Sequence, residues 1–535
     1  MNLQKITKIA ALMACSGLIS ATALAQPNEK NLYSLPFIKS TNGWLNSDNA
    51  SGLANVPVNN ISYVQASFDK TNGGFVNYFQ SNNSYNVNGI TESLYRLSPR
   101  VVVSGKVSYD YFRGKNMGGS YFIDPYFTPF DLVDSTTTNT GTKNLENFNL
   151  VGGVSVKIID NFYFGGKIDY TTSNYAKFKD LRHVNSLMDL KINAGLRYDI
   201  GDIFDIGVNY KFRRRVESID LNTYGTTDKR YYTIVSYGSF YGKREEFGDA
   251  GMTDDKRPLA ATFHGASLQL NFDFNKNISW FNEFSFNNRS GYYGIKSASK
   301  IVYTEDKGID LGYKTFLNIN QNKNIHTINI NGSYTNLSNY ENIFQETSKD
   351  GIIVVEYFDK KIVLDKTTIA AHLAYTANLN VNKCIPSWVI KGEIDGFMRN
   401  QETTIHPFYR KQNLISSTAF VNGTKNIIVK KNMFSIDLGA GYGFGTGTKN
   451  EDGTIGTPSS ATKKPYSATY ALDREFEFLT AHRINAAVGF KYSRFFKKGF
   501  TGYIGATYNF TNALNIEFLQ GAMRHNAAIT VGCSF

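Results

Sequence analysis

The chain has 535 residues and a formal net charge of +12, and it is rich in Tyr (34), Phe (39) and Gly (46) but poor in Pro (11). This mixture favours β-strands, and beyond the first 25 residues no uncharged apolar run of about 18 residues exists, which argues against membrane-spanning helices. A basic chain can bind nucleic acid, but no reader motif is present; anionic lipid headgroups or a basic lumen explain the charge more simply.

Residues 1–25 have the layout of a secretory signal peptide. Lys5 and Lys8 precede an apolar stretch without charge, and the small residues around Ala25 fit a cleavage site. An alternative is a lipoprotein box ending at Cys15, which would then be lipidated, but the apolar run before it is short. We expect cleavage after Ala25 and export of the mature chain.

Residues 26–61 show no clean alternation of apolar and polar positions. Trp44, Leu45, Leu53 and Val56 stand there among Asn, Ser and Gly. The segment is either a periplasmic tail or a small plug that folds into a lumen. Its apolar content favours the plug, because a free tail would be more uniformly polar.

From residue 62 onward, apolar residues alternate with polar or small ones in segments of about ten residues. In the last of them, Ile529 and Val531 point one way and Thr530 and Gly532 the other. That length crosses the hydrocarbon layer, whereas strands of soluble sandwiches are typically about five or six residues long. The expected strands are 62–80, 85–97, 101–113, 147–157, 161–173, 186–199, 204–216, 263–274, 278–290, 307–319, 325–338, 367–379, 386–400, 415–429, 433–446, 483–493, 500–511 and 525–535.

These segments predict an all-β protein: a transmembrane antiparallel up-and-down β-barrel over 62–535, in the bacterial outer membrane. About 18 strands are expected, and 14 or 16 stay open because 62–80 and 415–429 alternate least clearly. Short polar turns alternate with longer segments at 114–146, 217–262, 339–366 and 447–482. We expect the turns to be periplasmic and the long loops extracellular, with the sheet closed because lipid satisfies no open strand edge.

The closing strand ends on an aromatic residue, Phe535. Such an ending resembles the signal that the outer-membrane insertion machinery recognises. The expected partners are therefore that machinery and outer-membrane lipid, and no nucleic acid.

Several charged residues fall at predicted inward positions of the strands. They either set the selectivity of an open lumen or neutralise one another in a filled one. The candidates are Lys106, Asp110, Lys167, Asp169, Lys191, Arg197, Lys211, Arg213, Lys391, Glu393, Asp395 and Lys491. The densest basic run, 211–215, ends a strand on the predicted extracellular side, where we expect it to face phosphate-rich headgroups; substrate binding is the alternative.

Catalysis finds little support in the sequence. The seven histidines lack the spacing of zinc ligands, and no Gly-x-Ser-x-Gly motif is present. We therefore expect no catalytic residue, metal ligand or cofactor.

Two parts of the chain resemble known barrels. Residues 48–54, Asp-Asn-Ala-Ser-Gly-Leu-Ala, look like the Asn-Pro-Ala-Gly-Leu signature near the N-terminus of fatty-acid-transporter-like barrels, without its proline. A longer stretch, from about Ser47 through 118–125 and 179–183 to the end, is similar to an uncharacterised family of outer-membrane barrels from Bacteroidota-type bacteria. The resemblance implies the fold and the location, and no substrate or site residues.

The first functional hypothesis is a channel or transporter for an unidentified small molecule. The second is a non-conducting barrel that docks a partner protein or surface ligand through its loops, and the third is a barrel enzyme. The segments 114–146 and 217–262 carry many aromatic rings for exposed polypeptide, including Tyr121, Phe130 and Tyr237. We expect them to fold over the mouth as a lid.

Overall fold

The computed structural model describes residues 34–225, 228–249, 251–253, 256–349, 352–382, 384–496 and 499–535. The predicted signal peptide and Cys15 lie outside the described residues. Among the residues that are described, no helix is long and apolar enough to cross a membrane.

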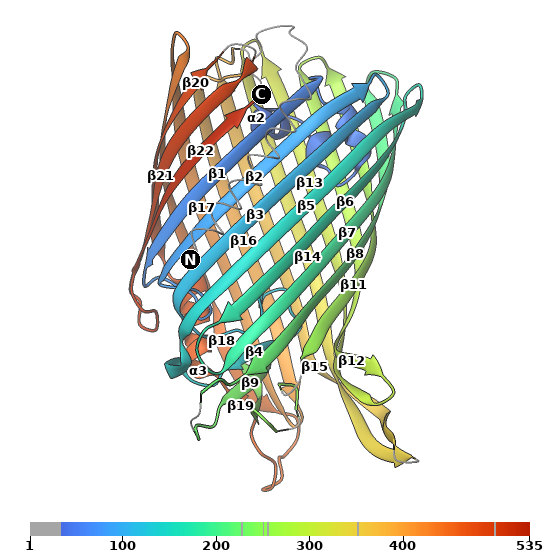
Figure 1. The fold of residues 1–535 in the computed structure, drawn as a ribbon, viewed down its shortest axis with the longest axis vertical. Coiled ribbons are helices and arrows are strands. Elements are labelled where there is room, and N and C mark those ends of the chain that lie inside the picture. The colour runs from blue at the N-terminus through green and yellow to red at the C-terminus, as the bar shows by residue number, and fades with distance from the viewer. Residues whose placement is uncertain are drawn as a thin grey trace.

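Eighteen antiparallel strands form a closed barrel, which confirms the predicted fold and strand count (Figure 1). Each strand pairs with its neighbours in sequence order, and β1 pairs with both β2 and β22 to close the ring. The strands are β1 (Asn60–Gly73), β2 (Asn83–Ser98), β3 (Val101–Met117), β5 (Gly141–Ile159), β6 (Phe162–Lys177), β7 (Arg182–Ile200), β8 (Phe204–Asn222), β11 (Arg257–Asn275), β12 (Ile278–Ser297), β13 (Lys300–Gln321), β14 (Asn324–Lys349), β15 (Ile352–Leu379), β16 (Trp388–Ile405), β17 (Phe408–Val429), β18 (Asn432–Thr454), β20 (Arg483–Phe495), β21 (Thr501–Ala513) and β22 (Met523–Ser534).

The outer face of the barrel is apolar. Along β18, the side chains of Ile436, Leu438 and Phe444 are exposed, while the residues between them face inward. The same alternation places Gln269 inside β11 and Leu268 outside, as the period of two predicted. A belt of this kind is typical of a transmembrane barrel, because lipid contacts only every second residue.

The strands are longer than the predicted ten residues. β14 has 26 residues and β15 has 28, so most of 339–366, predicted as a loop, continues the two strands as a projecting hairpin. The first predicted strand, in contrast, ends at Gly73 instead of residue 80, where a positive φ of 125° turns the chain away. Beyond the hydrocarbon layer no apolar belt is required, so the sequence pattern there does not reveal strand ends.

The two ends of the barrel differ. At the short-turn end, two-residue connections join most pairs of strands, as at Asp160-Asn161, where Asn161 has a φ of 64°, and longer ones follow β7, β15 and β20. At the long-loop end, a small sheet is formed by β4 (Asp131–Asp134), β9 (Tyr232–Gly238), β10 (Tyr241–Glu246) and β19 (Tyr466–Ser467), in the order β19-β10-β9-β4. Helix α3 (Thr469–Thr480) follows β19 and lies at the same end (Figure 1).

The described part of the N-terminal segment lies at the other end, inside the barrel. It contains α2 (Leu35–Ser40) and the 3₁₀ turns η1 (Trp44–Asn46) and η2 (Ala50–Asn55). Leu35 and Ile38 of α2 are buried with Ile61, Leu94 and Val102 of the barrel wall. We call residues 34–58 the inner segment.

Candidate functional site

The inner segment is seated against glycines of the barrel wall. A Cβ atom added to Gly165 would lie 1.9 Å from the backbone nitrogen of Ser51, and one on Gly195 would lie 2.1 Å from Oδ1 of Asn49. Asn49 donates from Nδ2 to the carbonyl of Leu196 at 3.1 Å. Residues 48–54, singled out in the sequence, therefore touch the wall so closely that only glycine leaves room for them.

Aromatic and charged contacts fix the rest of the inner segment. The buried Trp44 donates from Nε1 to Asp205 at 3.3 Å, and the guanidinium carbon of Arg197 lies 4.6 Å from its ring. Lys211 forms an ion pair with Asp48 at 2.7 Å. Burial raises the pKa of Asp48, but the ammonium groups of Lys211, Lys314 and Lys167 outweigh this effect and hold the pKa well below its usual range. Asp48 is thus ionised at any ordinary pH.

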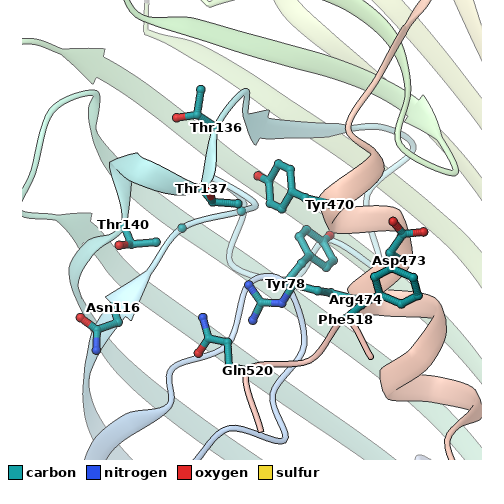
Figure 2. Close-up of a pocket in the computed structure, with 12 residues that line it drawn as sticks. Tyr78, Asn116, Thr136, Thr137, Thr140, Tyr470, Asp473, Arg474, Phe518 and Gln520 are labelled. Atoms are coloured by element: carbon teal, nitrogen blue, oxygen red, sulfur yellow. The ribbon is translucent and has the colours of Figure 1, made fainter. Parts of the chain in front are cut away.

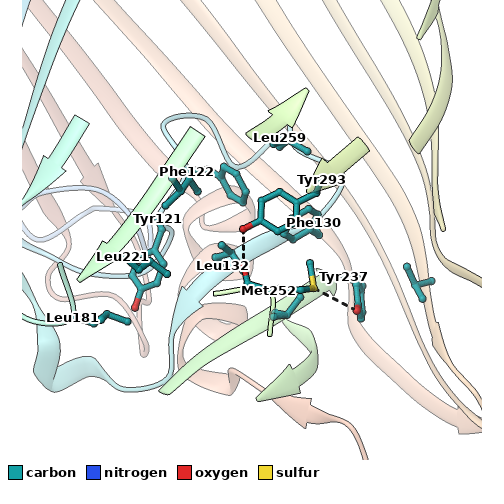
Figure 3. Packing of buried hydrophobic residues seen from close by; sticks show 13 residues of the cluster. Tyr121, Phe122, Phe130, Leu132, Leu181, Leu221, Tyr237, Met252, Leu259 and Tyr293 are labelled. Carbon is teal, nitrogen blue, oxygen red and sulfur yellow. Dashed lines mark hydrogen bonds between the residues drawn. The ribbon is translucent and has the colours of Figure 1, made fainter. Parts of the chain in front are cut away.

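The aromatic loops form a packed lid at the long-loop end (Figure 3). Tyr121, Phe130 and Tyr237 are buried together with wall residues, and Tyr293 of β12 donates to the carbonyl of Met252 at 2.7 Å. We use the term lid for the segments 118–140, 231–253 and 466–480, which include the small sheet and α3. This packing agrees with the prediction that the segments 114–146 and 217–262 fold over the mouth of the barrel as a lid.

Buried ion pairs join the lid to two sides of the barrel. On one side, Lys177 of β6 contacts Asp134 of β4 at 3.0 Å, and both side chains are almost fully buried. On the other side, Arg399 of β16 contacts Glu475 of α3 at 2.6 Å, again with both side chains buried. Between them, Lys366 of β15 donates to the carbonyls of Tyr126 and Thr128 at 3.2 and 3.3 Å. The lid is therefore held to the wall by buried polar contacts as well as by its packed aromatic residues.

The basic run at 211–215 faces mainly inward, so the expectation that it meets lipid headgroups is wrong for most of it. Arg213 and Arg215, with Arg289 of β12, place their guanidinium carbons 4.4 to 4.8 Å from the ring of Phe127 in the lid. Only Phe212 and Arg214 point outward, since neighbouring residues of a strand face opposite sides. Arg214 donates to Thr262 at 2.6 Å.

The predicted inward charges are spread along the wall and do not converge on one centre. Asp169 pairs with Lys191 at 3.3 Å, and Arg213 pairs with Asp189 at 2.6 Å. The other placements follow. Lys106 and Lys167 are partly buried; Asp110 accepts from Asn88; Arg197 pairs with Asp199 and Asp205; Lys211 pairs with Asp48; Lys391 pairs with Glu393; Asp395 lies 2.7 Å from His372; and Lys491 lies over the ring of Tyr503.

One stretch of inner wall carries few charges: among the inward residues of its strands, only Asp69, Arg483, Lys491 and Arg524 are charged. It is formed by β20, β21, β22 and β1, and its inward residues are mostly Asn, Thr, Ser, Gln, Ala and Gly. We call this stretch the amide wall, and its residues are Asn485, Ala487, Gly489, Lys491, Gly505, Thr507, Asn509, Thr511, Asn526, Ala528, Thr530, Gly532, Gln65, Ser67, Asp69 and Thr71. Thr507 and Asn509 are exposed although they face inward, so water covers them there.

A cavity of about 510 Å³ opens at the lid's edge (Figure 2), where loops that connect strands of the amide wall meet α3. Such a volume is in the usual range for small-ligand sites. We call it the mouth pocket, and it is lined by Tyr78, Asn116, Gly118, Gly119, Thr136, Thr137, Thr140, Tyr470, Asp473, Arg474, Phe518 and Gln520. Tyr78 comes from the β1–β2 loop, Phe518 and Gln520 from the β21–β22 loop, and Tyr470, Asp473 and Arg474 from α3.

Sequence reasoning singled out none of the side chains of the mouth pocket. They come from segments that are hundreds of residues apart, and no local motif joins them. The sequence feature that could have pointed to the pocket is the aromatic content of two connections, 74–82 and 514–522. These connections touch in the structure: a Cβ atom added to Gly74 would lie 2.3 Å from the backbone nitrogen of Gly521. Among the described residues, no three His, Cys, Asp or Glu side chains are grouped as metal ligands would be.

Comparisons with known proteins describe the chain as follows. The model of DUF6850, a family of unknown function, matches residues 50–535. No curated protein matches the chain. Among solved structures, the ferric preacinetobactin receptor BauA from Acinetobacter baumannii has 8% identity and a TM-score of 0.40, with coverage of 89% of this chain and 80% of that one. The toluene transporter TodX from Pseudomonas putida has 11% identity and a TM-score of 0.28, with 91% of each chain covered.

Proposed function

Because the chain belongs to DUF6850, a family of unknown function, we propose its function from its own geometry: a gated transport barrel of the bacterial outer membrane that passes a small hydrophilic molecule. The apolar outer belt supports the location. A barrel of 18 strands has a lumen wide enough for solute or a plug. In the outer membrane, its partners would be lipid, the solute and the insertion machinery; the role of Phe535 in recognition by that machinery stays a prediction.

The observation that carries the proposal is a lid joined to the wall by buried ion pairs, at the end of a lumen whose amide wall has exposed inward residues. The inner segment lies on glycines, in a fit that leaves no space for movement along the wall. The lid is held by a packed aromatic cluster and by ion pairs such as Arg399–Glu475, and Thr507 and Asn509 of the amide wall are exposed. In this proposal, movement of the lid opens a path along the amide wall.

The proposal is tested by conductance of the purified protein in planar bilayers. Wild-type protein is expected to open rarely, and Glu475→Gln should give long-lived openings, because the variant leaves the guanidinium of Arg399 buried without its carboxylate. The matched control is Glu402→Gln. It removes a carboxylate from β16, the strand that carries Arg399, but from an exposed ion pair with Lys411 of β17. If Glu475→Gln is as silent as the wild type and the control, transport is contradicted.

A second candidate function is docking of a partner protein. The hairpin of β14 and β15 projects beyond the rim (Figure 1), and Ile352, Tyr357 and Phe358 are exposed on it. Large exposed apolar side chains on a projecting element often mark an interaction surface. Docking would be favoured if a silent barrel co-purified with a protein and lost it on substitution of Phe358→Ser.

A further inference from the structure

We propose that the mouth pocket binds a neutral, polyhydroxylated solute of the carbohydrate type, and that the amide wall is its route below the pocket. The proposal rests on the proposed transport function and names its substrate class. Its starting point is the chemistry of the side chains that meet in the pocket from unconnected parts of the chain.

Aromatic rings form one part of the lining. Tyr78, Tyr470 and Phe518 come from different segments, and Phe518 is 42% exposed although it is a large apolar ring. The rings of a sugar have C–H faces that pack against flat aromatic surfaces, and aromatic side chains contribute large contact areas in this way. An exposed ring beside a cavity is thus suited to such a ligand.

Groups that both donate and accept hydrogen bonds form the second part. Asn116 and Gln520 carry amides, and both are held in place by Asn82: Asn116 donates to Asn82 at 3.1 Å, and Asn82 donates to Gln520 at 3.0 Å. With the hydroxyls of Thr136 and Thr137, they match the hydroxyls of a sugar, which also donate and accept.

The pocket contains charges of both signs. Asp473 and Arg474 are neighbours of opposite charge, and each is already engaged by the protein, so the anionic and cationic comparators in the test below are needed to separate charged ligands from neutral ones. Asp473 already accepts from Lys449 at 2.5 Å. Arg474 donates to the carbonyl of Asn77 at 3.3 Å, while its buried Nε has no hydrogen-bond partner among the described residues.

The position of the pocket joins it to the amide wall. The loops that supply Tyr78, Phe518 and Gln520 connect β1 to β2 and β21 to β22, so they cap part of the amide wall. Below them, the amides and hydroxyls continue: Asn526 donates to Thr71 at 2.9 Å, and Thr511 donates to Asn485 at 2.9 Å. The same kind of group thus lines both the pocket and the wall.

Helix α3 contributes Tyr470, Asp473 and Arg474 to the pocket and is bonded to the loop of Phe518. The carboxylate of Glu477 accepts from the backbone N–H groups of Phe518 and Leu519, each at 2.7 Å. Phe478 stacks on Phe75 of the β1–β2 loop, with ring centroids 4.9 Å apart. A solute that displaces the loop of Phe518 would therefore pull on the helix that carries the Arg399 ion pair.

The test is calorimetric titration of the purified full-length barrel with neutral trisaccharides: maltotriose, cellotriose and xylotriose. Trigalacturonic acid and the glucosamine trimer serve as anionic and cationic comparators. At least one neutral probe is expected to bind, and Phe518→Ala and Gln520→Leu should each weaken that binding by about tenfold or more. Tyr224→Ala, which removes another exposed aromatic ring outside the pocket, is the matched control and should leave the affinity unchanged.

The inference is overturned if none of the neutral probes binds, if only a charged probe binds, or if Phe518→Ala and Gln520→Leu bind like the wild type. Swelling of liposomes that contain Glu475→Gln separates this failure from failure of transport. If the liposomes swell in neutral trisaccharide but binding does not depend on the pocket, the protein is a transporter and the pocket is not its carbohydrate site. Pocket-dependent binding without swelling would leave a carbohydrate receptor that does not transport.

Discussion

Arg399 of β16 and Glu475 of α3 lie 2.6 Å apart with both side chains almost fully buried, and this pair joins the lid to the barrel wall. Arg399 also donates to Gln412 of β17 at 2.9 Å, so the guanidinium connects α3 with two strands. A buried charge without a partner is strongly unfavourable, whereas a buried pair can often be replaced by apolar side chains without loss.

The first prediction concerns the exchange of this pair. Arg399→Met or Glu475→Met alone should destabilise the closed lid by about 3–5 kcal/mol, because each leaves one charge buried and unpaired. The double variant should recover most of the closure, since no charge remains to be solvated. Single-channel open probability of the four proteins measures the effect. Additive opening in the double variant would show that the pair does not act as a latch.

The second prediction concerns the seat of the inner segment. Gly165→Ala and Gly195→Ala should displace residues 48–54 from the wall, because the added Cβ atoms have no space. Displacement should appear as a steady leak of ions and as new protease cleavage within 34–58. Gly152→Ala is the control, since its Cβ would meet no atom within 4 Å. If all three variants leak ions equally, the contact of residues 48–54 with Gly165 and Gly195 is not what closes the lumen.

The third prediction concerns the two faces of β14. Ile330 is exposed on the outer face, and Asn329 faces the lumen. Ile330→Arg should lower the free energy of unfolding from lipid vesicles by about 2–4 kcal/mol if the residue is near the bilayer midplane. Asn329→Arg should be tolerated much better, because water solvates the guanidinium in the lumen. Similar losses for the two variants would contradict the register of this strand.

The fourth prediction is a pH dependence of lid closure. Burial raises the pKa of Asp131 in β4 to about 7, although hydrogen bonds from Ser120 and Tyr78 and the charge of Lys143 act in the opposite direction. The closed lid therefore binds this proton more tightly than an open lid would. Its contribution to closure is fully present below about pH 4 and is lost as the pH rises through about 7. Open probability should increase over this window.

Asp131→Asn tests the assignment of that pH dependence. The amide cannot ionise, so the open probability of the variant should vary less with pH than that of the wild type between about pH 4 and 7. An unchanged pH profile would show that another group controls the dependence.

Much of the barrel could be predicted because the signals are local. A strand that meets lipid must alternate every second residue, as Ile436 to Phe444 do, and a two-residue turn such as Asp160-Asn161 marks where one strand ends. All of the predicted spans correspond to observed strands in order, and the barrel has 18 strands. The same alternation, applied to 211–215, would have separated Arg213 and Arg215 from Arg214.

The sequence by itself therefore determined the class of fold and which face of the clearly alternating strands meets lipid, since these depend on neighbouring residues and on the bilayer; it predicted about 18 strands, and closure of the sheet in the structure decided between 18 and the smaller numbers. Only the tertiary structure decided how far the strands rise beyond the membrane, that the inner segment rests on Gly165 and Gly195, and that Lys177 and Arg399 hold the lid. It also brought Tyr78 and Phe518 to one pocket. Contacts between segments so distant in the chain arise from closure of the barrel, and no local pattern encodes them.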